Sequence, residues 1–396
     1  MNEHVAVVDL GYGDAGKGTV VDAICAATPV RAVLRFNGGA QAAHNVITED
    51  GRHHTFAQFG SGTLRGVPTH LTRFMVVDPL ALAAEAAALG NPFELLTVDG
   101  DALLATPWHR AANRRREAER GWSRHGSCGM GVGEAMSYAL SHADAPRVAD
   151  TRSRARLRKV LAAVEEDLGP IGAPLDDVVE AFALFGSTVS IVDGAHTGRL
   201  LREGPCVFEG AQGVLLDEWR GWHPHTTWST TTFDNVAALC GSFRRLGVVR
   251  TYTTRHGAGP FVTEDASLAL PEAHNGTGEW QGTFRVGHFD AVAHRYAVEV
   301  AGGVHGLAVT HLDTPAHCAS LRVCTSYEID GVDVDRLVPG TLGDLAHQAE
   351  LTARLFRARP GRLHRPADWS GEIESLLGAP VEIESHGPTS AEKKFV

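Results

Sequence analysis

The chain has 396 residues, of which 43% are hydrophobic, and a formal net charge of −11 at pH 7. A chain of this length and composition can bury a large core, as one large α/β domain or as two closely joined ones. The negative charge argues against nonspecific binding to nucleic acid or to an anionic membrane, because both need clustered lysine and arginine.

Along the chain, short apolar runs alternate with segments of helical periodicity. The expected strands are residues 5–10, 74–77, 189–192, 206–208 and 307–309, and the expected helices include residues 19–25, 79–89 and 154–168. This alternation is typical of an α/β fold with a large, mainly parallel central sheet flanked by helices. No composition break marks a linker, so we expect a single domain over residues 1–396 with inserted helical segments at about 90–185.

A glycine-rich segment, residues 11–18, lies between the first strand and the first helix. Its glycines let several N–H groups and the helix N-terminus approach one anion, and Lys17 adds a mobile positive charge. The spacing fits the first part of a P-loop, but Gly18 stands where a magnesium-binding Ser or Thr is usual. Asp14 is then the nearest candidate ligand, because magnesium prefers hard oxygen atoms. A glycine-rich turn with a capping aspartate is the alternative.

Five sequence blocks in order resemble the adenylosuccinate synthetase family almost from end to end. The family's loop reads Gly-Asp-Glu-Gly-Lys-Gly, and residues 13–18 of this chain read Gly-Asp-Ala-Gly-Lys-Gly. The other blocks are residues 35–44, 208–217, 252–264 and 310–313. The resemblance implies a magnesium-dependent C–N ligase. Such an enzyme uses a nucleoside triphosphate to phosphorylate a carbonyl oxygen of a purine nucleotide, and an amine then displaces the phosphate.

The resemblance also implies a role for particular residues. Asp14 and His44 match the family's catalytic Asp and His, and Asp14 and the carbonyl of Ala43 match its metal contacts. The implied contacts to the phosphates and the nucleotide are Gly13, Gly16, Lys17, Gly18, His311, Asp313, Ser385 and Gly387. The implied acceptor contacts are Gln41, Cys128, His142, Gln212, Leu216, Thr227 and Gly257.

Several positions near the acceptor phosphate depart from the family. Ser127 and Cys128 replace a Thr pair, and Met130 stands where an Arg is usual. His142 aligns with an Arg that reaches the phosphate from the partner subunit of the family's dimer. A neutral His cannot make the planar bidentate contact of an Arg, so we expect the acceptor to carry its phosphate differently or to lack it.

The largest departure is the loop that grips aspartate in the family through a run of arginines. Only Arg285 remains of that run, and the candidate amine contacts are Trp280, Thr283 and Arg285. A desolvated dicarboxylate needs matching positive charge, so aspartate recognition of the usual kind is in doubt. Trp280 would suit a less charged amine donor, or it is a packing aromatic.

The block at residues 310–313 bears on the choice of nucleotide. Asp313 keeps the guanine signature, while His311 replaces a Lys that packs along the base, so GTP is favoured with ATP as the alternative. Two other classes remain open: a phosphoryl-transfer enzyme that stops after the first step, and a nucleotide-binding homologue without ligase activity. A phosphate-release assay with and without an amine separates all three.

The expected partners are small molecules, with no nucleic acid and no membrane. A homodimer follows from the resemblance alone. The arginine-rich segment 110–124 contains interspersed glutamates and is interpreted as a solvated helical face. The six cysteines form no close CxxC pair, and no apolar run is of membrane-spanning length, so we expect a cytoplasmic protein with reduced thiols.

Overall fold

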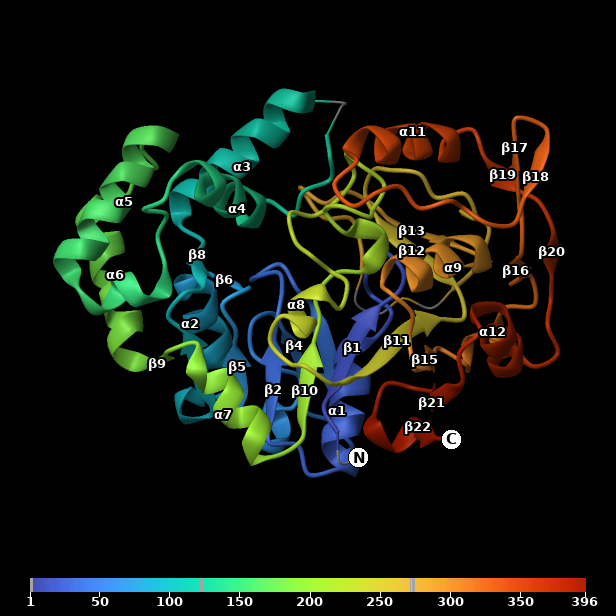
Figure 1. Ribbon diagram of the computed structural model, residues 1–396, viewed down its shortest axis with the longest axis horizontal. Coiled ribbons are helices and arrows are strands. Elements are labelled where there is room, and N and C mark those ends of the chain that lie inside the picture. Colours follow the sequence, from blue (N-terminus) through green and yellow to red (C-terminus); the bar gives the residue numbers. More distant parts are fainter. Residues whose placement is uncertain (1–2, 122–123, 271, 273–274) are drawn as a thin grey trace.

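The structure is a computed structural model that describes residues 3–121, 124–270, 272 and 275–396. At its centre is a ten-stranded sheet (Figure 1), in which every pairing is parallel except that of the edge strand β22. Across the sheet the strands are β22 (Lys393–Phe395), β21 (Val381–Ser385), β15 (Gly306–Thr310), β11 (Arg244–Arg250), β1 (Val5–Asp9), β10 (Cys206–Glu209), β2 (Ala32–Arg35), β5 (Thr69–Leu71), β7 (Leu96–Asp99) and β9 (Ser190–Val192). The predicted α/β fold with a mainly parallel sheet is confirmed.

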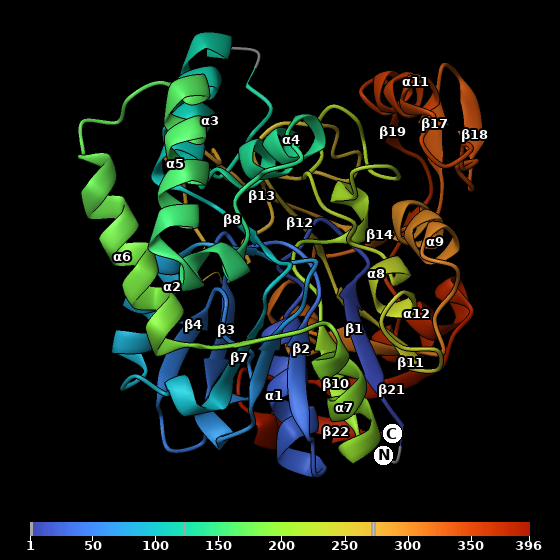
Figure 2. The same cartoon turned by 60° about the vertical axis from the view of Figure 1, so that its left-hand side comes forward.

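Helices cover both faces of the sheet (Figures 1 and 2). Val5 and Val7 of β1 pack with α1, whereas Ala6 and Val8 belong to a larger apolar cluster with α7, α9 and α12. A strand buried on both faces reads as a continuous apolar run, as this one does. The helices are α1 (Lys17–Ala27), α2 (Pro79–Ala88), α3 (Pro107–Arg120), α4 (Val132–Ser141), α5 (Arg154–Leu168), α6 (Leu175–Thr188), α7 (Ala195–Glu203), α8 (Asp234–Ala237), α9 (Ala291–Val300), α10 (Thr314–His317), α11 (Leu345–Leu355) and α12 (Trp369–Leu377).

Helices α3 to α6 lie between β8 (Leu103–Leu104) and β9 in the chain, beside one end of the sheet (Figure 2). They pack on a second apolar cluster that includes Trp108, Leu161 and Phe182. These helices correspond to the insert expected at about residues 90–185, but they begin at Pro107, because the earlier part of that range supplies β7 to the central sheet. That the chain is a single domain stays a prediction.

The remaining strands form small sheets around the central one. They are β3 (His44–Ile47), β4 (His53–Phe56), β6 (Val76–Val77), β8, β12 (Thr253–His256), β13 (Phe284–Gly287), β14 (Phe289–Asp290), β16 (Val323–Cys324), β17 (Tyr327–Ile329), β18 (Val332–Val334), β19 (Arg359–Pro360) and β20 (Leu363–His364). The strand expected at 74–77 is therefore shorter, and it pairs with β8 outside the central sheet. None of the described helices is both long enough and apolar enough to cross a membrane.

Candidate active site

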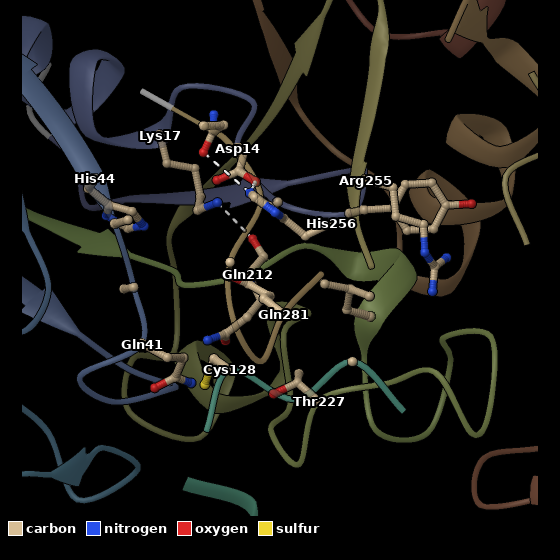
Figure 3. A pocket seen from close by; sticks show the side chains of 18 of the residues that line it. Asp14, Lys17, Gln41, His44, Cys128, Gln212, Thr227, Arg255, His256 and Gln281 are labelled. Atoms are coloured by element: carbon tan, nitrogen blue, oxygen red, sulfur yellow. Dashed lines mark hydrogen bonds and ion pairs between the residues drawn. The ribbon is translucent and has the colours of Figure 1, made fainter. Parts of the chain in front are cut away.

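A cavity of about 950 Å³ opens where β1, β2, β10, β11 and β15 reach their carboxyl ends (Figure 3). Loops that follow these strands form much of its wall. Helices α3 and α4 and the loop at 275–281 complete it. Ligands of parallel α/β sheets gather at this edge, because the loops that can contact them converge there.

The glycine-rich loop after β1 is fastened by Asp9, the last residue of that strand. The carboxylate of Asp9 accepts hydrogen bonds from the N–H groups of Gly11 and Ala15, both at 2.8 Å, and from Lys17 Nζ at 3.2 Å. Lys17 also donates to the main-chain oxygen of Gln212 at 2.7 Å, which ties the loop to the segment after β10. Helix α1 begins at Lys17 without a side-chain cap, so its first N–H groups remain available for an anion such as phosphate.

Position 18 requires glycine for a steric reason. A Cβ atom there would lie 2.8 Å from the Cβ of His44 and 3.1 Å from the Oγ of Ser61. Real Cβ atoms do not approach this closely, so any side chain at Gly18 would displace His44. A metal-binding hydroxyl therefore does not fit here, and the ligand must come from elsewhere in the loop.

Asp14 lies at the tip of the same loop, with a positive φ of 60°. Burial raises the pKa of its carboxyl group, and the charges of His256, Arg250 and Lys17 offset part of that rise. His256 Nε2 lies 3.6 Å from Asp14 Oδ2 (Figure 3). Arg250 Nε donates to the main-chain oxygen of Asp14 at 2.5 Å. A raised pKa makes the carboxylate a better proton acceptor near neutral pH, as a general base requires.

The same aspartate fits a magnesium ion. Asp14 and Ala43 both line the cavity, and they offer one carboxylate and one main-chain carbonyl. Magnesium takes its remaining ligands from water and substrate phosphates, so a site with few protein ligands suits it. Within the described part of the chain, no group of three or more His, Cys, Asp or Glu side chains could hold a metal by itself.

His44 is oriented by Glu209, the last residue of β10. His44 Nδ1 lies 2.6 Å from Glu209 Oε1, and Ser61 donates to the same carboxylate through its N–H, at 2.9 Å, and through its hydroxyl. Burial raises the pKa of Glu209, but Arg35, His44 and Ser61 outweigh it and lower the pKa to about 2. Burial lowers the pKa of His44 to about 4. An ionised carboxylate can only accept a hydrogen bond, so Nδ1 of His44 carries the ring proton. Nε2 is then the unprotonated nitrogen of the ring.

The acceptor side of the cavity is rich in unpaired amides. Five expected acceptor contacts line it: Gln41, Cys128, Gln212, Leu216 and Thr227. The side-chain amide atoms of Gln41 and Gln212 are buried without a hydrogen-bond partner among the described residues (Figure 3). Buried polar atoms are nearly always bonded, so these amides are available to a substrate. Gly257 does not line the cavity; it lies against the carbonyl of Gln281, where a Cβ would collide.

All four residues expected at the nucleotide base also line the cavity: His311, Asp313, Ser385 and Gly387. The two segments that carry them are paired, since the N–H of Leu312 donates to the oxygen of Ser385 at 3.0 Å. Lys393 Nζ then donates to the oxygen of Gly387 at 2.5 Å and holds the second segment in place. Asp313 therefore lines the cavity on a segment that hydrogen bonds hold in place.

Comparison with known proteins agrees with these features. The family model described as adenylosuccinate synthetase matches residues 6–358. The chain belongs to the adenylosuccinate synthetase family. It is 33% identical to the adenylosuccinate synthetase of Alkalilimnicola ehrlichii, over 99% of this chain and 98% of that protein. It is 33% identical to the one of Myxococcus xanthus as well, over 98% and 97%.

Solved structures show the same fold. The fully ligated adenylosuccinate synthetase of Plasmodium falciparum matches with a TM-score of 0.83 and 19% identity, over 100% of both chains. The succinoaminodeoxyadenylate synthetase of cyanophage S-2L, bound to dGMP and dATP, matches with a TM-score of 0.64 and 18% identity, over 100% of this chain and 95% of that one. The predicted family is thus confirmed, and the chain is a C–N ligase of the adenylosuccinate synthetase type.

In this adenylosuccinate synthetase homologue, the loop expected to bind the amine contributes other residues to the cavity. The three expected contacts are not part of the cavity lining: Trp280, Thr283 and Arg285. Gln281 does line it. Arg285 is engaged elsewhere, since Nε and Nη2 pair with the carboxylate of Glu264 and Nη1 donates to the main-chain oxygens of Gly257 and Gly259, both at 2.9 Å. The one arginine kept from the family's run therefore does not face the amine site.

His142 also lies away from the cavity of its own chain. It follows the end of α4, stacks on Tyr138 at 3.9 Å between ring centroids, and places Nε2 3.1 Å from Asp167. Its expected contact is with a second subunit and stays a prediction. The solvated-face interpretation of segment 110–124 needs correction, because Arg116 and Arg120 line the cavity and pair with glutamates.

Sequence reasoning missed several groups of this site. In the sequence, Asp9 is predicted only as part of a strand. Glu209 and His256 lie within two of the family blocks without a predicted role of their own. The positions of Glu209 and His256 inside those blocks are the sequence signal that could have identified them as site residues. Their partners come from distant segments, since Glu209 is 165 residues from His44.

Proposed function

We propose that this chain is a magnesium-dependent, GTP-driven ligase that joins an amine to a purine nucleotide of the inosine monophosphate type, with ATP as the alternative phosphate donor. The observation that supports this most directly is the joint presence of Asp14, Lys17, His44 and Asp313 in the lining of one cavity. Asp14 and His44 suit the chemistry of phosphoryl transfer. Lys17 suits binding of the phosphates, and Asp313 suits recognition of guanine. The family is GTP-dependent and requires magnesium.

In the first half-reaction, Asp14 accepts the proton from the ring nitrogen beside the purine carbonyl. The carbonyl oxygen then forms a bond to the γ-phosphorus of GTP, and GDP leaves with the electrons of the broken bond. Lys17 and the N-terminus of α1 bind the phosphates. A magnesium ion held by Asp14 and the Ala43 carbonyl would neutralise part of the phosphate charge.

His44 acts beside the transferred group. Its Nε2 takes up a proton from water as the phosphates bind, because their negative charge raises the pKa that burial lowers in the free protein and Glu209 stabilises the imidazolium at Nδ1. A charged donor at this position binds the phosphoryl group more tightly in the transition state than a neutral one would.

In the second half-reaction, the amine nitrogen attacks the carbon that carries the phosphorylated oxygen. A C–N bond forms, the C–O bond breaks, inorganic phosphate leaves, and the amine gives up a proton. The internal bonds of Arg285 favour an amine with fewer carboxylates than aspartate, because a dicarboxylate needs cations that are free to pair with it. Aspartate itself is the alternative donor.

We also propose a cytoplasmic homodimer, from family membership. In that dimer, the partner's His142 would approach the acceptor phosphate. Mixing an Asp14→Ala variant with a His142→Ala variant tests this, because each mixed dimer would regain one intact site. Activity that stays at the level of the separate variants would contradict shared sites.

The deciding experiment is phosphate release from GTP with magnesium and inosine monophosphate, over a panel of amines that includes aspartate and a control without amine. We expect release that depends on one amine and is lost in Asp14→Ala but kept in Asp50→Ala, the same change at an exposed aspartate. Release without any amine would instead indicate a phosphoryl-transfer enzyme. No release under any condition would indicate a nucleotide-binding homologue.

A further inference from the structure

Two loops that bind different substrates in the proposed function meet at a tryptophan. We use "acceptor loop" for residues 126–131 and "amine loop" for residues 276–285. Each loop contributes to the cavity wall, through Cys128 and Gln281 among others (Figure 3). In the chain Gly129 follows Cys128 and Trp280 precedes Gln281. Gly129 and Trp280 touch each other directly.

The indole ring of Trp280 lies against Gly129 of the acceptor loop. A Cβ atom at Gly129 would be 2.8 Å from Cγ of Trp280 and 3.0 Å from its Cδ1, so the ring occupies the space that any side chain would need. Gly129 also has a φ of 72°, which favours glycine. The contact therefore depends on an aromatic ring in one loop and on a glycine in the other.

Two arginines from the α3 region hold the ring. The guanidinium carbons of Arg114 and Arg124 lie 5.7 Å and 5.8 Å from the ring centroid of Trp280. Arg114 Nε donates to the oxygen of Gly129 at 3.1 Å, and Arg124 Nη1 lies 3.5 Å from the oxygen of Glu279. Each arginine thus contacts the ring and the main chain of a loop, so the cation–π contacts and the hydrogen bonds support the same arrangement.

The conformation of the amine loop places this ring at the tip of the loop. Gly278 and Gly282 exchange main-chain hydrogen bonds of 2.9 Å and 3.1 Å, which places Trp280 at the tip of a tight turn. Gly257 also lies between the two loops, since a Cβ atom there would be 2.2 Å from the oxygen of Gln281 and 3.7 Å from Cα of Gly126. A shift of the tip would therefore move Gln281 on one side of the cavity and Cys128 on the other.

We propose that Trp280 is a positioning residue that holds the amine loop against the acceptor loop, so that the acceptor and amine sites form together. The proposal rests on the proposed ligase function for its effect on catalysis. It assigns to Trp280 no contact with either substrate. Loss of the ring should loosen both loops while leaving the phosphate loop and Asp313 unchanged.

Hydrogen exchange of the free protein, followed by mass spectrometry, tests the structural part without any ligand. We expect Trp280→Ala to speed exchange in residues 126–131 and 276–285 by about tenfold, and Arg114→Gln by about threefold. Trp280→Phe should stay near wild type. Arg115→Gln is the matched control, because Arg115 lies on the same helix but donates to Leu168. Unchanged exchange in residues 126–131 of Trp280→Ala would overturn the proposal.

Steady-state kinetics then separate positioning from a direct contact. We expect Trp280→Ala to raise KM for both inosine monophosphate and the amine by about tenfold, with KM for GTP within about twofold. A rise for the amine alone would overturn the proposal and make Trp280 a substrate contact. If the wild type releases no phosphate, the ligase function fails, while the exchange experiment still decides whether Trp280 holds the two loops.

Discussion

Glu209 controls the protonation of His44, and Glu209→Gln would test that control. Glu209 is fully buried, and its Oε2 accepts from the N–H of Ser61 while its Oε1 accepts from His44 Nδ1. In the variant, the Ser61 N–H still needs an acceptor, so the amide oxygen takes the Oε2 position and the NH₂ group faces His44. Nδ1 must then accept a hydrogen bond from this NH₂ group, so the ring proton moves to Nε2. A second proton at Nδ1 would face another donor, and the imidazolium is therefore disfavoured.

The expected loss follows from the missing imidazolium. A hydrogen bond to a charged group contributes about 1.5–3 kcal/mol, and a positioned acid or base contributes about 10²–10⁴ in rate. We therefore expect kcat to fall by about 10²–10³, with KM for GTP within about threefold, because the phosphate loop is untouched. Glu209→Ala is a poorer probe, because it also removes the acceptor of the Ser61 N–H and leaves a cavity at a fully buried position.

The assay is phosphate release at saturating GTP, acceptor and amine, with thermal unfolding as the folding control. Ser61→Ala is the matched variant, because it removes a hydroxyl bond to Glu209 but keeps the carboxylate. We expect it to retain kcat within about fivefold. A wild-type kcat in Glu209→Gln, or an equal loss in Ser61→Ala, would show that the charge of Glu209 does not act through His44.

Three further changes test other parts of the structure. Gly18→Ala should lower both melting temperature and kcat, because its methyl group would lie 2.8 Å from the Cβ of His44 and overpacking costs about 1–3 kcal/mol; an unchanged melting temperature in calorimetry would contradict this contact. Asp313→Asn should reduce the GTP-to-ATP ratio of kcat/KM by about tenfold to a hundredfold, and an unaltered ratio would argue against guanine recognition there. Burial raises the pKa of Asp290 from 3.8 to about 6, so the folded state binds this proton more tightly than the unfolded chain. The free energy of unfolding should therefore fall as pH rises between these values, and denaturant titrations of Asp290→Asn should show a flatter profile; a profile like that of the wild type would refute the assignment.

Several parts of the protein depend on short-range chemistry and can be predicted from the sequence alone. An apolar strand, a run of glycines and Lys17 within a few residues specify a phosphate loop, because the backbone conformations and the helix N-terminus are set locally. The alternation of strands and helices specified the parallel sheet and, with it, the edge where the loops gather. The resemblance of the motifs added Asp14 and His44 as the reacting pair.

Long-range packing sets which groups act on that pair and which of the expected site residues line the cavity. Glu209 reaches His44 across 165 residues, and the need for glycine at position 18 comes from the close approach of His44. Arg285 and Trp280 were expected to contact the amine, yet one is bound to Glu264 and the other packs on Gly129. These contacts join loops from different strands, and their geometry depends on how the strands are ordered in the sheet, which no local pattern encodes.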